Sequence, residues 1–186
     1  MNIQLVGLSG SLRKGSYNTA LLQAAAAMLP PDVSLTIAAI DDLPLYNADL
    51  DKPAVADRPA TVVRLREQLA AAHGILIASP EYNYGIPGGL KNAIDWASRG
   101  EDAPLRHKPV ALMGATISLW GTVRMQLSFL PVFQYLSMKP HYQPEVLVNE
   151  AVKKFDKGGN LTDVATREII AKKLQSFRQF ILDGLA

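Results

Sequence analysis

Residues 3–18 of this 186-residue chain read IQLVGLSGSLRKGSYN, an apolar run followed by a loop of glycine, serine and basic residues. The run Ile3–Leu8 is mostly apolar on both faces, which is typical of a strand buried inside a parallel sheet. A helical pattern over 18–29 follows and ends at Pro30 and Pro31, because proline cannot continue a helix. Strand, loop and helix in this order predict the start of a βαβ unit.

The rest of the chain repeats this alternation of strands and helices. Val33, Leu35 and Ile37 alternate with polar residues, which predicts a half-exposed strand at an edge of the sheet. Residues 74–79 and 109–115 are continuous apolar runs, and they predict fully buried strands.

Capping and proline signals set the predicted bounds of the later elements. Asp57 is expected to cap a helix that Gly74 ends. Pro131 is expected to kink or divide the helix that follows the fourth strand, and a short strand is predicted between 139 and 148. Thr162 is the expected cap of the last helix.

The alternation predicts a single α/β domain over residues 1–186, with a parallel sheet sandwiched between two helical layers. Because the second strand reads as an edge and crossovers are right-handed, five strands in the order 2-1-3-4-5 fit better than a six-stranded dinucleotide fold. This is the flavodoxin-like arrangement. Its ligands bind beyond the carboxyl ends of the first and third strands, so the loops that leave those strands are the places to look for function.

Composition excludes several classes of function. The formal net charge is +2 and basic residues are scattered, which gives no argument for a nucleic-acid partner. The absence of cysteine excludes disulfides, thiolate nucleophiles and cysteine-based metal centres, and the three histidines are too far apart to predict a metal site. With neither a signal sequence nor an apolar run near the roughly 20 residues that span a bilayer, a cytoplasmic protein without membrane association is expected.

The loop at 9–18 combines hydroxyls, a guanidinium, two glycines and a helix N-terminus. Unpaired N–H groups and the helix dipole favour an anion there. Arg13 can grip phosphate oxygens through two hydrogen bonds, and Ser11, Ser16 and Asn18 can donate the others. Gly10 and Gly15 have the Walker spacing, but Ser16 and Tyr17 replace its Lys-Ser/Thr, and the Rossmann glycine spacing is absent. Because hydroxyl donors surround the anion on several sides, a terminal phosphate monoester is expected. The alternative is a loop that forms only a turn and a helix cap.

The second loop, PEYNYGIPGG at 80–89, follows the third strand. Its tyrosines and prolines offer flat apolar walls, and backbone N–H groups at Glu81, Tyr82 and Asn83 could face the polar edge of a heterocycle. A planar ring here, with its phosphate in the neighbouring loop, has the dimensions of flavin mononucleotide (FMN). The alternative is an aromatic turn that packs on the core.

These two loops resemble those of the NADPH-dependent FMN reductase family, and most closely those of bacterial quinone and chromate reductases. The similarity includes LPLYN at 43–47 and LKNAIDW at 90–96, and it runs through nearly the whole chain. The resemblance implies a set of cofactor-binding residues: Ser11, Arg13, Ser16 and Asn18 at the phosphate, Pro80, Glu81, Tyr82 and Asn83 along the isoalloxazine, mainly through their backbone, and Thr116 in the loop after the fourth strand.

That third loop departs from the family. Relatives carry a Gly- and Ser-rich segment before GTARAQ, whereas this chain has TISLW at 116–120 before GTVRMQ at 121–126. Trp120 either shapes the acceptor pocket or is a buried anchor. Relatives often have an arginine near the position of Leu130, and it contributes to packing between dimers in a tetramer. This chain lacks that arginine. The resemblance therefore implies a homodimer more strongly than a tetramer.

The implied function is that of an NAD(P)H-dependent oxidoreductase for quinones and similar acceptors: chromate, azo compounds, ferric complexes and free flavin. Hydride chemistry belongs to the flavin, so no catalytic side chain is predicted. Nicotinamide would pass hydride to flavin N5 and leave before the acceptor arrives, which gives ping-pong kinetics. NADPH is preferred over NADH on the resemblance alone.

Two other functions stay open. The first is a flavodoxin-type electron carrier without its own NAD(P)H turnover, although such carriers present an acidic surface and their phosphate loops lack an arginine. The second is a regulatory protein that senses flavin or redox state. In the enzyme, the connection 41–59 and loops of a second subunit are expected to wall the acceptor space.

Overall fold

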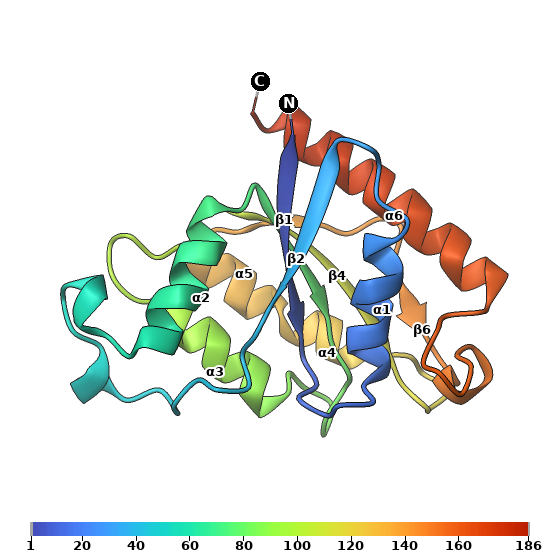
Figure 1. The fold of residues 1–186 in the computed structure, drawn as a ribbon, viewed down its shortest axis with the longest axis horizontal. Coiled ribbons are helices and arrows are strands. Elements are labelled where there is room, and N and C mark those ends of the chain that lie inside the picture. The colour runs from blue at the N-terminus through green and yellow to red at the C-terminus, as the bar shows by residue number, and fades with distance from the viewer. Residues whose placement is uncertain (1, 186) are drawn as a thin grey trace.

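A parallel sheet of order β2-β1-β3-β4-β5 forms the centre of the computed structural model, which describes residues 2–185 (Figure 1). The predicted strand order and fold class are confirmed. The predicted strand between 139 and 148 is two short strands, both of which pair with β4. The strands are β1 (Ile3–Ser9), β2 (Val33–Ala38), β3 (Gly74–Ala78), β4 (Pro109–Ala115), β5 (Lys139–His141) and β6 (Leu147–Val148).

Helices cover both faces of the sheet and make two separate cores. Helices α1 and α6 pack on one face, whereas α2, α3, α4 and α5 pack on the other (Figure 1). Strands β1, β3 and β4 are buried by both layers, which explains their continuous apolar sequences. The helices are α1 (Tyr17–Ala26), α2 (Ala60–Ala71), α3 (Gly88–Ala97), α4 (Val123–Ser128), α5 (Leu130–Leu136) and α6 (Val164–Asp183).

Strand β2 is the exposed edge that its sequence predicts. From Val33 to Ile37 its side chains alternate between half-buried and exposed positions, and among residues 2–185 it pairs only with β1. Within residues 2–185, no helix is both long enough and apolar enough to cross a membrane.

The predicted bounds of α2 are wrong at both ends. Pro59 occupies the N-cap position without a side-chain cap, and Asp57 lies in a preceding 3₁₀ turn. Gly74 begins β3 instead of ending α2. A Cβ atom at Gly74 would lie 2.8 Å from Ile181 Cδ1 and 3.0 Å from Phe177 Cζ of α6, so close packing between helix and sheet favours a glycine here.

Two other helix signals had clearer outcomes. The division at Pro131 is confirmed, because α4 ends at Ser128 and α5 begins at Leu130. The cap of α6 is Asp163 and not Thr162: the Asp163 carboxylate accepts a hydrogen bond from the Thr166 N–H at 2.8 Å. Asp163 and Thr162 are both good caps by residue type, so the sequence alone could not separate them.

Candidate functional site

The loops that leave β1, β3 and β4 meet at the carboxyl edge of the sheet. The Gly10 N–H donates to the Ala78 carbonyl at 2.8 Å, and a Cβ atom at Gly10 would lie only 2.1 Å from Ser79 Oγ. The Ser79 N–H donates in turn to the Met113 carbonyl of β4 at 3.1 Å. Only a glycine lets the first loop pass so close to the second, and this contact brings the predicted phosphate and ring residues to one edge.

Asn18 ties the first loop to the end of β4. Its Nδ2 donates to the Ala115 carbonyl at 2.9 Å, and its Oδ1 accepts from the Ala115 N–H at 2.8 Å. The side chain is buried, and 97 residues separate the partners in sequence. Asn18 therefore positions the N-terminus of α1, a role that sequence reasoning missed because the partner is backbone and carries no sequence signal.

Ser16 caps α1, and the loop before it keeps free donors. Ser16 Oγ accepts from the N–H groups of Asn18 and Thr19 at 3.1 and 3.3 Å, which leaves its hydroxyl hydrogen for a ligand. Ser11 is buried nearby, and in the described part of the chain the loop N–H groups from Leu12 to Gly15 have no acceptor. The loop is therefore both a helix cap and a cluster of unpaired donors that suits an anion.

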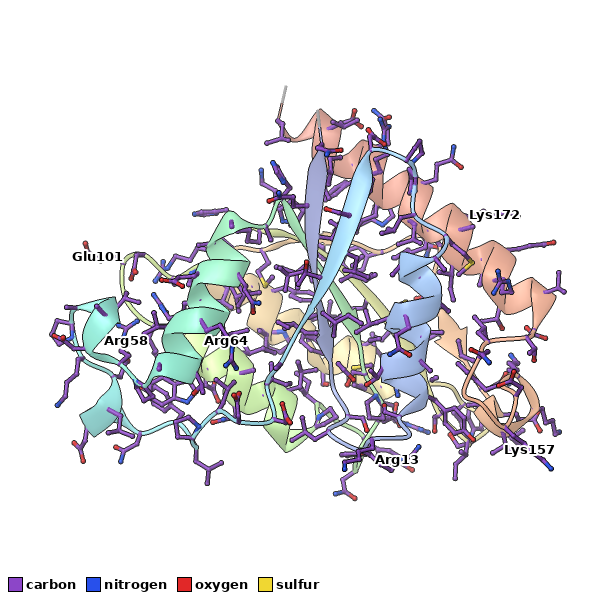
Figure 2. All side chains as sticks on the ribbon, in the orientation of Figure 1. Arg13, Arg58, Arg64, Glu101, Lys157 and Lys172 are labelled. Carbon is purple, nitrogen blue, oxygen red and sulfur yellow. The ribbon has the colours of Figure 1, made fainter. Side chains whose placement is uncertain are left out.

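Arg13 projects from this loop into solvent. Figure 2 labels it at the lower edge of the molecule, beneath the tip of β1. Its side chain folds past Gly15, where a Cβ atom would lie 3.0 Å from Nη1, and its Cζ is 5.8 Å from the Tyr17 ring centroid. Arg13 forms no ion pair with any residue in 2–185, so its guanidinium is available to a phosphate.

The second loop contains a tight turn from Tyr82 to Gly85. These two residues exchange backbone hydrogen bonds of 3.3 and 3.0 Å, and both central residues, Asn83 and Tyr84, are left-handed, with φ of 49° and 66°. Tyr82 and Tyr84 are 51% and 68% exposed, so the alternative of an aromatic turn packed on the core is wrong.

This turn also limits which backbone donors can reach a ligand. The Tyr82 N–H is used inside the turn, contrary to the expectation that it faces a heterocycle. The N–H groups of Glu81 and Asn83 have no acceptor within residues 2–185, and they remain available.

The Glu81 carboxylate locks the second loop onto α4. Its Oε2 accepts from the backbone N–H groups of Arg124 and Met125 at 2.9 and 3.1 Å, and its Oε1 lies 3.4 Å from Arg124 Nη1. The Glu81 side chain is only 10% exposed. Both carboxylate oxygens are thus bonded within the protein, so Glu81 can contact a ligand only through its backbone.

The third loop is tied at its start and exposed along its length. The Thr116 N–H donates to the Val148 carbonyl at 2.9 Å. Beyond it, Ile117, Leu119 and Trp120 are each 70% exposed. The alternative of Trp120 as a buried anchor is therefore wrong, and the indole stands at the rim of the site.

The connection 41–59 forms a wall against α3. The Pro44 carbonyl accepts from Asn92 Nδ2 at 2.9 Å and from Trp96 Nε1 at 2.8 Å. The Tyr46 N–H donates to Asn92 Oδ1 at 2.7 Å, and the Tyr46 ring meets the Trp96 ring edge-on at 5.0 Å. The segments LPLYN and LKNAIDW, which both carried the family resemblance, thus contact each other.

The sheet order defines a flavodoxin-like protein in which the loops after β1, β3 and β4 meet at the carboxyl edge. The family described as NADPH-dependent FMN reductase matches residues 3–153. An NAD(P)H-dependent FMN reductase of Pseudomonas aeruginosa is 43% identical over 180 residues, 97% of this chain and 96% of that protein. A quinone reductase of Escherichia coli is 37% identical, over 96% and 95% of the two chains.

The structural comparison agrees with the sequence comparisons. The structure of FerB, a flavoenzyme NAD(P)H:(acceptor) oxidoreductase from Paracoccus denitrificans, matches with a TM-score of 0.87 and 28% identity, over 97% of this chain and 98% of that one. This chain belongs to the NADPH-dependent FMN reductase family. It is accordingly an oxidoreductase that works with FMN and a nicotinamide nucleotide.

The residues at the carboxyl edge fit FMN. Free N–H groups and Arg13 at the α1 N-terminus match a terminal phosphate, and the glycine contact at Gly10 leaves the backbone of two loops side by side. The exposed rings of Tyr82 and Tyr84 lie in the adjacent loop, as a planar ligand requires.

Proposed function

We propose that this protein is an FMN-dependent NAD(P)H:quinone oxidoreductase. The observation that carries the proposal is the pairing of a donor-rich anion loop, including the unpaired Arg13, with an exposed aromatic turn at the same sheet edge. Relatives named as quinone reductases support the choice of acceptor. When held by these two loops, FMN would supply the hydride-transfer chemistry between the nicotinamide and the quinone, in two separate ping-pong half-reactions at flavin N5.

The protein's part in this reaction is to bind and orient. We assign the FMN phosphate to Ser11, Arg13 and Ser16, with Asn18 holding the loop against β4. The isoalloxazine edge is assigned to one set of loop residues, which act mainly through their backbone: Pro80, Glu81, Tyr82, Asn83 and Thr116. Glu81 and Asn83 supply free N–H groups, whereas the Tyr82 N–H is kept by its own turn.

The proposed range of acceptors is wide because an open flavin face discriminates little between one acceptor and another. Quinones are the primary acceptors in this proposal, and chromate, azo compounds, ferric complexes and free flavin are further ones. NADPH is the proposed donor, as in the family's description. A cytoplasmic location fits a donor that is held inside the cell.

A homodimer is the proposed assembly, with a tetramer as the second arrangement. Leu12, Leu45 and Ile117 are 53%, 84% and 70% exposed, and burying such apolar side chains against a second copy would favour association. A second copy could cover them and wall the acceptor space. Light scattering coupled to gel filtration would measure the mass, and a monomer at micromolar concentration would refute this assembly.

The proposed activity is tested by the visible absorption spectrum of the purified protein, before and after anaerobic addition of NADPH. A flavin spectrum that bleaches with NADPH and returns with benzoquinone supports the proposal. A flavin spectrum that NADPH leaves unchanged would instead indicate an electron carrier. If no flavin binds even when FMN is supplied, the assignment of both loops is wrong.

A further inference from the structure

Arg124 lies against two exposed aromatic rings at the rim of the site. Its Cζ is 4.1 Å from the Tyr84 ring centroid and 5.8 Å from the Trp120 ring. Tyr84 comes from the loop after β3 and Trp120 from the loop after β4. Their side chains are 68% and 70% exposed, and that of Arg124 is 37% exposed. We call these three residues the rim triad.

The backbone holds the rim triad in place. Tyr84 is left-handed within its tight turn, which costs free energy for a non-glycine residue and is tolerated because the turn hydrogen bonds and the Glu81 contacts with α4 fix the loop. Gly121, with φ of 64°, follows Trp120, and a Cβ atom there would lie 3.1 Å from Leu147. The three side chains are thus presented to solvent by ordered segments.

The guanidinium of Arg124 has donors to spare. Stacking on a ring occupies the face of the guanidinium and leaves its N–H groups pointing outward in the plane. Among residues 2–185 the only contact of these groups is with Glu81 Oε1, at a long 3.4 Å. Glu81 Oε2 is occupied by two backbone N–H groups of α4, so only Oε1 faces the guanidinium, and the other Arg124 side-chain N–H groups have no acceptor among residues 2–185. The remaining donors suit the bidentate binding of an oxyanion.

We propose that the rim triad selects planar aromatic acceptors that carry an anionic substituent, such as a sulfonated or carboxylated naphthoquinone. Trp120 and Tyr84 would contact the aromatic ring, and Arg124 would bind the oxyanion at its edge. This inference rests on the proposed quinone reductase activity and names the acceptors that the site prefers.

The test compares two acceptors with the same ring, 1,4-naphthoquinone and its 2-sulfonate. We expect Trp120→Ala and Arg124→Lys each to lower kcat/KM for the sulfonate about tenfold more than for the parent quinone, mainly through KM. Lysine keeps the charge but loses the planar fork. Leu119→Ala removes an equally exposed side chain from the same loop, and it should change kcat/KM by the same factor for both acceptors.

The ratio of kcat/KM between the two acceptors cancels any effect of a substitution on flavin binding or on reduction of the flavin by NADPH. If the variants lower kcat/KM equally for both quinones, or leave both unchanged, the rim triad does not select acceptors. Trp120 is exposed, so its replacement leaves the fold intact and this outcome stays interpretable. If wild-type protein fails to reduce benzoquinone with NADPH, the proposed function itself is wrong, a result that is distinct from loss of selectivity.

A binding assay gives a second readout that needs no turnover. The chain has two tryptophans, and Trp96 is fully buried, so a quencher in solution reaches Trp120 alone. We expect anthraquinone-2-sulfonate to quench the fluorescence of the wild-type holoprotein in a saturable way and to leave that of Arg124→Lys, which keeps Trp120 as the reporter, unsaturated over the same range. Identical saturable curves for the two proteins would overturn the inference.

Discussion

Arg66, buried on α2, and Arg13, exposed in the first loop of the site, use their N–H groups in opposite ways. Arg66 of α2 is 3% exposed, and its Nη1 donates to the carbonyls of Trp96 and Arg99 at 3.1 and 3.0 Å. It also pairs with the Asp102 carboxylate at 3.0 Å. Arg13, by contrast, has no carboxylate partner among residues 2–185.

This difference separates scaffold from site. A buried guanidinium is tolerated only when carbonyls and carboxylates replace the water it has lost, and it then stabilises the loops that supply them. An exposed guanidinium with free donors costs little and keeps its binding capacity. Residue type alone does not distinguish the two, whereas the count of unused N–H groups does.

The largest expected effect is the loss of the buried arginine. Arg66→Met should lower the free energy of unfolding by about 3 kcal/mol, because it strands two buried carbonyls of the 96–102 segment. Urea denaturation measures this. Arg64 lies on the same helix, in an exposed pair with Asp42, and Arg64→Met should cost less than about 1 kcal/mol. Equal losses of stability in the two variants would show that the buried arginine stabilises the fold no more than the exposed one.

The next effect tests the link between the first loop and β4. Asn18→Ala should lower the free energy of unfolding by about 2 kcal/mol, because it leaves the N–H and the carbonyl of Ala115 without a partner. FMN affinity should fall with it, since the loop loses its anchor. Gln23→Ala, an exposed change on the same helix, is the control and should stay within about 0.5 kcal/mol. A stable Asn18→Ala protein would show that the loop is held by other contacts.

The exposed arginine should affect the ligand and not the fold. Arg13→Ala is expected to weaken FMN binding about tenfold, or about 1.4 kcal/mol, with the unfolding free energy of the apoprotein nearly unchanged. Flavin fluorescence during titration measures the affinity. The exposed neighbour Lys14 is the matched control, and Lys14→Ala should change the affinity less than threefold, about 0.6 kcal/mol. Full flavin retention by Arg13→Ala would refute the phosphate assignment.

The smallest effect extends the comparison to a half-buried imidazole. Burial, together with the charge of Lys173, lowers the pKa of His141 to about 4 from 6.5. As the pH falls from about 6.5 towards 4, His141 binds a proton in the unfolded chain but stays neutral in the folded one, so the free energy of unfolding falls. His141→Phe should flatten this pH dependence, by roughly 1 kcal/mol at pH 5. His107→Asn, at an exposed left-handed position, should leave it unchanged.

Much of the architecture was predictable because burial leaves a signature in sequence. The continuous apolar runs of β1, β3 and β4 and the alternation in β2 gave the strand order. Boundaries were harder. Asp57 looked like a cap and Gly74 like a helix end, but proline geometry and contact with α6 decided those positions. Such signals are local, and tertiary packing overrides them.

For the proposed site, the sequence pointed to the loops after β1, β3 and β4, and the structure shows which of their groups are already bonded within the protein. Residue types at 9–18 predicted an anion cradle, and the described structure has the free donors that a cradle needs. The anchoring by Asn18 and the cap that Glu81 provides for α4 depend on backbone partners 97 and 43 residues away. Because the partners are backbone groups, the residue types at those distant positions do not predict these hydrogen bonds.

The sequence by itself determined the strand order, the family and the loops to which the proposed site is assigned, because hydrophobic periodicity and short motifs are local properties of the chain. The tertiary structure alone decided that Trp120 is exposed, that Tyr84 and Arg124 stack beside it, and which arginines keep free donors. Those properties depend on which distant backbone groups use up hydrogen bonds and on how loops from separate strands approach one another. That information exists only once the chain has folded.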